Sequence, residues 1–184
     1  YLAVPSQSNA KAQNLPSTQG QYDLALLLKK ELEDLGLSDI VLEDNAILSA
    51  KLKGNANKKS IGFCAHLDTV DVGLSEVIKP QILKFEGKAL HLNKEKNIFC
   101  DPKEHPELLK YLDEDIIFSD GTSVLGADNK AAIATIMTLL VYLVNEKCDH
   151  GDVYVCFVPD EEIGLRGSKA LDLKYFNPDF AFTI

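Results

Sequence analysis

DVYVCFVPDEEIG, at residues 152–164, is the stretch that decides the fold. Residues 152–158 form a short apolar run of the kind that is typical of a strand buried on both faces. Pro159 follows the run, and the acidic residues Asp160, Glu161 and Glu162 come directly after it. Most acidic triplets are solvated loops, but this one follows the most apolar predicted strand of the chain. We therefore expect a buried strand with carboxylates at its carboxyl end.

Two other predicted strands also end near polar side chains. Residues 60–65 form an apolar run that leads into His66 and Asp68, and a strand candidate at residues 116–118 precedes Asp128. Parallel strands bring their carboxyl ends to one edge of a sheet, where ligands bind. Unpaired carboxylates gathered there would repel one another unless a cation lay among them. The three turns together predict a metal site at this edge.

The residue types suggest roles for the first two turns. The imidazole of His66 can bind a metal while Asp68, two positions further along an extended chain, accepts the other ring N–H and fixes the tautomer. Asp128 stands just before a predicted helix, so it is either an N-cap residue or a metal ligand. The small neighbours Gly126 and Ala127 favour the second reading, in which a carboxylate bridges two cations roughly 3.5–4 Å apart.

The adjacent glutamates Glu161 and Glu162 can divide the work of such a site. One would coordinate a metal, while the other would take a proton from metal-bound water and pass it to the leaving amine. Nitrogen and oxygen ligands without cysteine suit zinc, manganese or cobalt. A catalytic site is favoured, because structural zinc sites usually close with thiolates.

The rest of the pattern predicts an α/β fold with a largely parallel sheet and helices on both faces. A helix with leucines on its apolar face is expected to begin at Ser17 or Thr18, either of which can cap it, and to end at Gly36. Its predicted apolar face consists of Leu24, Leu27, Leu28, Leu32 and Leu35. Further expected elements are hairpins at residues 40–42 with 47–52 and 81–84 with 89–92, helices at 106–112, 130–145 and 167–171, and a core strand at 180–184.

Composition limits the classes of partner. The 184 residues, of which 46% are hydrophobic, are enough for one domain with a sizeable core. A net charge of −9 argues against binding nucleic acid or an anionic membrane, and leaves peptides and small molecules as candidate partners. The longest apolar run, residues 130–147, is interrupted and too short to span a bilayer, so it predicts a buried helix. Cys64 and Cys156 lie within predicted buried strands, and reduced thiols of this kind suggest the cytoplasm.

Three motifs resemble those of one enzyme family. HLDT at residues 66–69, LGADNK at 125–130 and PDEEIG at 159–164 are together similar to the zinc exopeptidases that include peptidase T, aminoacylase and bacterial carboxypeptidase relatives. Four further stretches look like peptidase T in particular: LPSTQGQ at 15–21, KPQI at 79–82, DGT at 120–122 and HGD at 150–152. The resemblance covers nearly the whole chain.

The resemblance implies a three-layer α/β/α catalytic domain of a tripeptide aminopeptidase. Such an enzyme releases the N-terminal residue of a short peptide by attack of water bound to two zinc ions, for which manganese or cobalt are alternatives. Asp128 would bridge the ions, with His66 on one and Glu162 on the other. Glu161 would be the general base and Asp68 would orient His66. The peptide bond after Asp128 is expected to be cis, and Asn129 stands where peptidase T commonly has a second aspartate.

The same resemblance implies that residues 1–184 are the N-terminal part of the catalytic domain. A further aspartate ligand would come immediately after Ile184, followed by a lid or dimerisation domain and a C-terminal catalytic segment with a histidine ligand. The full-length protein would then be a homodimer candidate, and the fragment alone would be nearly inactive. Two alternatives stay open: a deacylase, desuccinylase or carboxypeptidase with the same fold and metals, and a non-catalytic metal-binding domain.

Overall fold

The computed structural model describes all residues, 1–184, and divides into two compact units. The larger unit contains Tyr1, Ser6–Asp71 and Gly126–Ile184, and the smaller contains Leu2–Pro5 and Val72–Leu125. All the predicted site residues belong to the larger unit.

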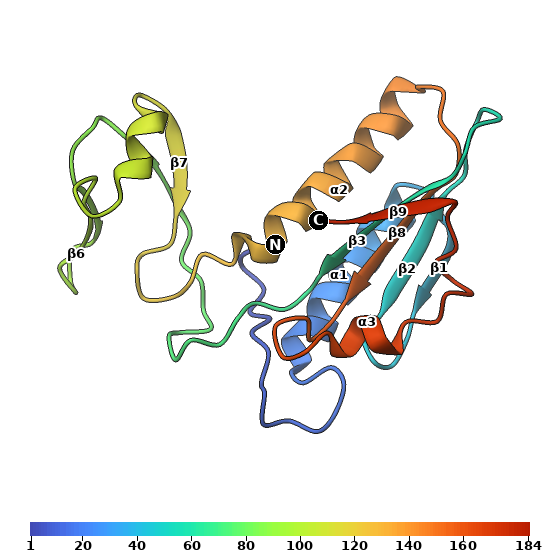
Figure 1. Ribbon diagram of the computed structural model, residues 1–184, viewed down its shortest axis with the longest axis horizontal. Helices are drawn as coiled ribbons and strands as arrows, with labels where there is room; N and C mark the ends of the chain where they lie inside the picture. The colour runs from blue at the N-terminus through green and yellow to red at the C-terminus, as the bar shows by residue number, and fades with distance from the viewer. The chain divides into compact units, whose positions relative to one another are not determined.

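A five-stranded mixed sheet forms the centre of the larger unit, in the order β1-β2-β8-β3-β9 (Figure 1). Its strands are β1 Ser38–Leu42, β2 Leu48–Leu52, β3 Ile61–His66, β8 Val153–Val158 and β9 Phe180–Thr183. β3 is parallel to both β8 and β9, whereas β1 and β2 form the predicted hairpin and β2 pairs antiparallel with β8. The α/β fold is confirmed, but β9 is an exposed edge strand and not the predicted core strand.

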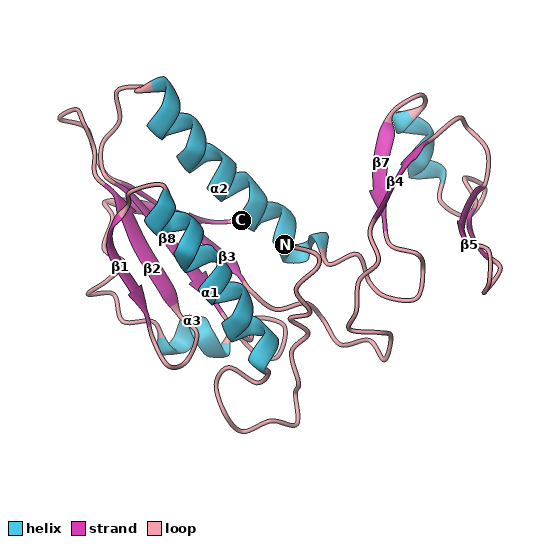
Figure 2. Ribbon diagram, turned by 180° about the vertical axis from the view of Figure 1, so that it is seen from behind, coloured by secondary structure: helices cyan, strands magenta, loops and turns pink.

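Two helices, α1 Gln19–Asp34 and α2 Ala127–Glu146, lie on one face of the sheet (Figure 2). Their buried apolar residues recur every three or four positions, which is the spacing of one helix face. These residues are Leu24, Leu28 and Leu32 in α1, and Ile133, Ile136 and Leu140 in α2. Full burial of each such side chain stabilises the fold by roughly 1.5–3 kcal/mol.

The opposite face of the sheet is covered by the chain segment that comes directly after the short helix α3, Arg166–Ala170. Phe176 packs there with Cys156, Val158 and Ile47 in a buried apolar cluster. The side chains of β8 therefore alternate between two buried faces, as the apolar run at residues 152–158 predicts.

The length and composition of α2 would suffice to cross a membrane, but part of the helix is buried in protein. Its buried residues are Asn129, Lys130, Ala132, Ile133, Ile136, Met137 and Leu140. The predicted helix is therefore confirmed, but only one of its faces is buried, and Val141 and Tyr142 are exposed on the other.

The start of α1 differs from the prediction. Thr18 occupies the N-cap position, but its hydroxyl donates to the carbonyl of Gln7 and makes no capping bond, and Ser17 points toward Asp160. Leu27 is 37% exposed, so it lies outside the buried stripe. Gly36 ends the helix as predicted, with a φ of 78° that favours glycine.

In the smaller unit, β4 Gln81–Lys84 pairs antiparallel with β7 Asp115–Phe118. The predicted hairpin of residues 81–84 and 89–92 is therefore wrong. Buried Phe85 continues the pairing through backbone hydrogen bonds with Asp113 and Glu114, so the chain does not turn back after β4. β5 Leu90–Asn93 pairs instead with β6 Ile98–Cys100, and a 3-10 helix occupies Pro106–Tyr111.

Candidate metal centre

The parallel pairing of β3 with β8 brings two of the predicted turns together. His66, the last residue of β3, is in register with Val158, the last residue of β8. The backbone N–H of Leu67 then donates to the carbonyl of Val158 at 2.8 Å, which ties the two strand ends together. Asp68 and the acidic turn after Pro159 consequently lie side by side at the carboxyl edge of the sheet, as the sequence predicts.

Asp128 also lies at this edge, but it is not placed there by the strand that the sequence predicts before it. β7 belongs to the separate two-stranded sheet, so Asp128 is placed by the first turn of α2. Gly126 before it has a φ of 71°, and Asp128 and Asn129 depart from helical geometry. The peptide bond between them is cis, as the family resemblance implies. The Asn129 side chain donates to the Ile184 carbonyl at 2.6 Å, which an aspartate there could not do.

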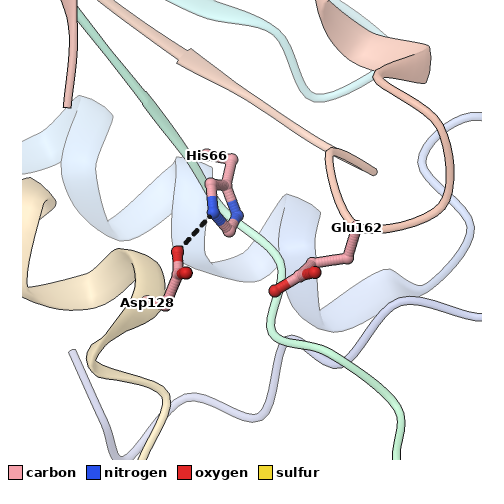
Figure 3. A group of neighbouring side chains, drawn as sticks. All are labelled: His66, Asp128 and Glu162. Atoms are coloured by element: carbon pink, nitrogen blue, oxygen red, sulfur yellow. Dashed lines mark hydrogen bonds and ion pairs between the residues drawn. The ribbon is translucent and has the colours of Figure 1, made fainter.

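The imidazole of His66 lies between two aspartates, of which Figure 3 draws Asp128. Its Nε2 is 2.9 Å from Oδ1 of Asp128, and its Nδ1 is 2.9 Å from the backbone oxygen of Asp68 and 3.3 Å from the Asp68 carboxylate. Burial alone would lower the pKa of His66, but hydrogen bonds to Asp68 and Asp128 and the nearby negative charges raise it to about 9. His66 is 7% exposed, whereas the Asp128 side chain is 83% exposed. The Asp128 side of the site is therefore open to solvent.

Asp68 has a second role that its spacing from His66 does not reveal. Its fully buried carboxylate accepts the backbone N–H of Glu161 at 2.9 Å and that of Glu162 at 3.2 Å. Burial would raise the pKa of Asp68, but hydrogen bonds from His66, Glu161 and Ser8 hold it below its usual range. One carboxylate thus contacts the imidazole and fixes the backbone of both glutamates.

His66, Asp128 and Glu162 form a group that could hold a metal ion. Their ligand atoms all lie within 4.8 Å of one another, although they come from three separate segments (Figure 3). Burial raises the pKa of Glu162, and the neighbouring carboxylates of Asp128, Asp68 and Glu161 add to this effect. One nitrogen and two carboxylate ligands suit zinc or a similar divalent ion, with positions left for further ligands. The predicted ligands fit a metal by type and position.

Glu161 is half-buried and adjoins this ligand group without belonging to it.

The sequence-based prediction gave no role to two other buried polar residues near the site. Asp160 is fully buried, and burial lowers the pKa of Lys130 in α2 to about 8. An acidic triplet in sequence does not show which of its members points inward, so the burial of Asp160 could be recognised only in the structure.

The chain is similar to several known peptidases. The sequence model of the M42 glutamyl aminopeptidase family matches residues 112–184. A peptidase T-like protein of Yersinia pestis is 57% identical over the whole of this chain, and a peptidase T of Alkaliphilus oremlandii is 42% identical over the whole chain. The chain spans 45% and 46% of the length of these two relatives, which is a little under half.

A solved structure agrees with the sequence relatives. The aminopeptidase PepT from Bacillus cereus matches the whole chain with a TM-score of 0.69 and 25% identity, and 40% of its own length is covered. The resemblance to peptidase T is therefore confirmed over the full chain, in sequence and in fold.

Proposed function

We propose that this chain is the N-terminal part of the catalytic domain of a cytoplasmic, peptidase T-like metallo-aminopeptidase that removes the N-terminal residue from tripeptides. One observation carries the proposal: His66, Asp128 and Glu162 converge on one point, with Glu161 beside them, in a chain that resembles peptidase T throughout. The four unpaired cysteines are consistent with a reducing compartment.

The ligands divide between two metal ions in this proposal. Asp128 would hold both ions, His66 would hold one of them and Glu162 the other. When bound, divalent ions of this kind polarise a peptide carbonyl and lower the pKa of water. The exposed side of the Asp128 carboxylate supports its role as the bridge, because a second ion and a substrate could reach it from solvent.

Two residues beside the ligands transfer the proton and hold the ligands and the base in place. Glu161 takes a proton from the attacking water and delivers it to the leaving amine. Asp68 holds the backbone of Glu161 and Glu162 and orients His66, so base and ligands keep a fixed spacing. The remaining ligands and the groups that recognise the peptide termini lie outside this chain, and we expect the isolated chain to hydrolyse peptides poorly.

A substrate panel tests the proposal. The complete protein, with zinc, manganese or cobalt restored, is assayed against alanyl tripeptides, alanyl dipeptides and N-acyl amino acids. Preference for tripeptides with a free amino group is the expected result. Preference for N-acyl amino acids would replace the proposal with a deacylase, and the absence of hydrolysis with every metal would favour a non-catalytic metal-binding domain.

A further inference from the structure

We propose that Asp160 is a positioning residue, which holds Glu161 and Glu162 at the metal centre by anchoring the acidic turn to the start of α1. The inference rests on the proposed function, because it assigns these glutamates to the site. Asp160 itself neither binds a metal nor contacts substrate in that scheme.

The side chain of Asp160 is fully buried and satisfied by partners far away in the sequence. Its Oδ2 accepts the backbone N–H of Ser17 at 2.9 Å. Its Oδ1 accepts the Ser17 hydroxyl at 2.5 Å and the Gln21 side-chain amide at 2.7 Å. A buried carboxylate is strongly unfavourable unless it is hydrogen-bonded and paired in this way. These hydrogen bonds therefore join the acidic turn to the start of α1, although the two segments are about 140 residues apart in the sequence.

The backbone of Asp160 is held by the same neighbours. Its N–H donates to Oε1 of Gln21 at 2.9 Å, so Gln21 contacts both the side chain and the main chain. Its φ of 55° lies in the left-handed region, which aspartate and asparagine tolerate better than most residues. The position thus suits a short side chain that can fix an unusual turn.

Arg166 extends the anchor across the N-terminal segment. Its guanidinium lies 3.4 Å from Oδ2 of Asp160 and donates to the carbonyls of Ala12, Gln13 and Asn14. The backbone N–H of Arg166 donates to the carbonyl of Asp160 at 3.0 Å. The positive charge of Arg166 offsets the negative charge of the buried Asp160 carboxylate.

The two catalytic glutamates follow directly, so their placement depends on this anchor. Asp68 binds the N–H groups of Glu161 and Glu162 from the sheet edge, while Asp160 holds the residue before them against α1. Side chains that coordinate a metal or transfer a proton must be held to within roughly 0.5 Å. Loosening one attachment should therefore weaken metal binding and catalysis together, and should change substrate binding less.

The test is Asp160→Asn in the complete protein. The substitution keeps the shape and tolerates the left-handed backbone, but it removes the charge and turns one acceptor into a donor facing Ser17 or Gln21. We expect metal affinity, measured by calorimetry, to fall at least tenfold, kcat to fall about tenfold to a hundredfold, and KM to change less than threefold. The visible spectrum of the cobalt-substituted protein should shift, because Glu162 moves relative to the ion.

Two further variants separate positioning from folding. Ser17→Ala removes one hydrogen bond and should reproduce the same pattern more weakly, and combining it with Asp160→Asn should add little. Asp172→Asn removes an equal charge from an exposed position and should leave the metal affinity and the cobalt spectrum unchanged.

Wild-type cobalt spectra and metal affinities in the Asp160 and Ser17 variants, accompanied only by a lower melting temperature, would overturn the inference. If the wild-type protein bound metal without hydrolysing any peptide, the proposed function would fail. The metal affinities and spectra of the variants would still decide the role of Asp160.

Discussion

The imidazole of His66 is doubly protonated and positively charged at neutral pH in the metal-free protein, because its pKa of about 9 lies well above neutrality. The hydrogen bonds to Asp68 and Asp128 that stabilise the charged imidazole occupy both ring nitrogens. A metal ion binds only the neutral ring, so it must displace this proton. Metal binding and protonation therefore compete at the same nitrogen.

This competition predicts a pH dependence with a definite sign. Below pH 9 each unit of falling pH should weaken metal binding by up to tenfold through His66, and above pH 9 this contribution should level off. Calorimetric titration of zinc in buffers with different ionisation enthalpies measures the protons released. About one proton per site is expected from His66 near pH 7.5 and none above pH 10. Affinity that does not change between pH 7 and pH 9 would contradict this assignment.

The grouping of the three candidate ligands at one edge of the sheet could be predicted from sequence, whereas some of their contacts could not. His66 and Glu162 follow apolar runs that form neighbouring parallel strands, so residue type and local pattern were sufficient to group them, whereas Asp128 is placed by α2 and not by the strand predicted before it. The contact of Asp68 with Glu161 joins residues 93 positions apart and depends on the register of β3 and β8. No local pattern encodes that register.

Among the elements, α3 has a direct effect on the acidic turn. The N–H of Gly167 donates to the carbonyl of Pro159 at 3.0 Å, and a Cβ at Gly167 would lie 2.3 Å from that oxygen. Only glycine lets the helix approach the backbone of the turn this closely.

Gly167→Ala should therefore push α3 away from the turn. We expect a loss of about 1–3 kcal/mol in the free energy of unfolding, as for other overpacked sites, measured by urea titration of the complete protein. Ser168→Ala, at the exposed neighbouring position, is the matched control and should change stability by less than about 0.5 kcal/mol. Equal stability of the two variants would show that the close approach is unimportant.

The elements that periodicity identifies are those with a continuous apolar face. α1, α2, β3 and β8 pack against the sheet or lie within it, and their patterns predicted them with bounds close to those observed. The pairing of β4 with β7 was not predicted, because their short runs are separated by about 30 residues and favour no particular partner.

At the scale of the whole molecule, the site is assembled from segments that are remote in the chain. β3, the start of α2 and the turn after β8 each contribute one of the three grouped side chains, so the proposed metal centre would form only when the larger unit is folded. The chain covers 45% of the Yersinia pestis relative, which leaves more than half of such a protein to supply further ligands and substrate contacts. The activity we propose is accordingly a property of the complete protein.

The most direct test of the central claim is the turnover of an alanyl tripeptide by Glu161→Gln in the complete protein, with bound metal measured in the same sample. The account predicts full metal content and a fall in kcat of about 10²–10⁴-fold, since the base is lost while the ligands remain. Glu146→Gln, at the exposed end of α2, should match the wild type. Wild-type turnover by Glu161→Gln with its metal bound would contradict the account.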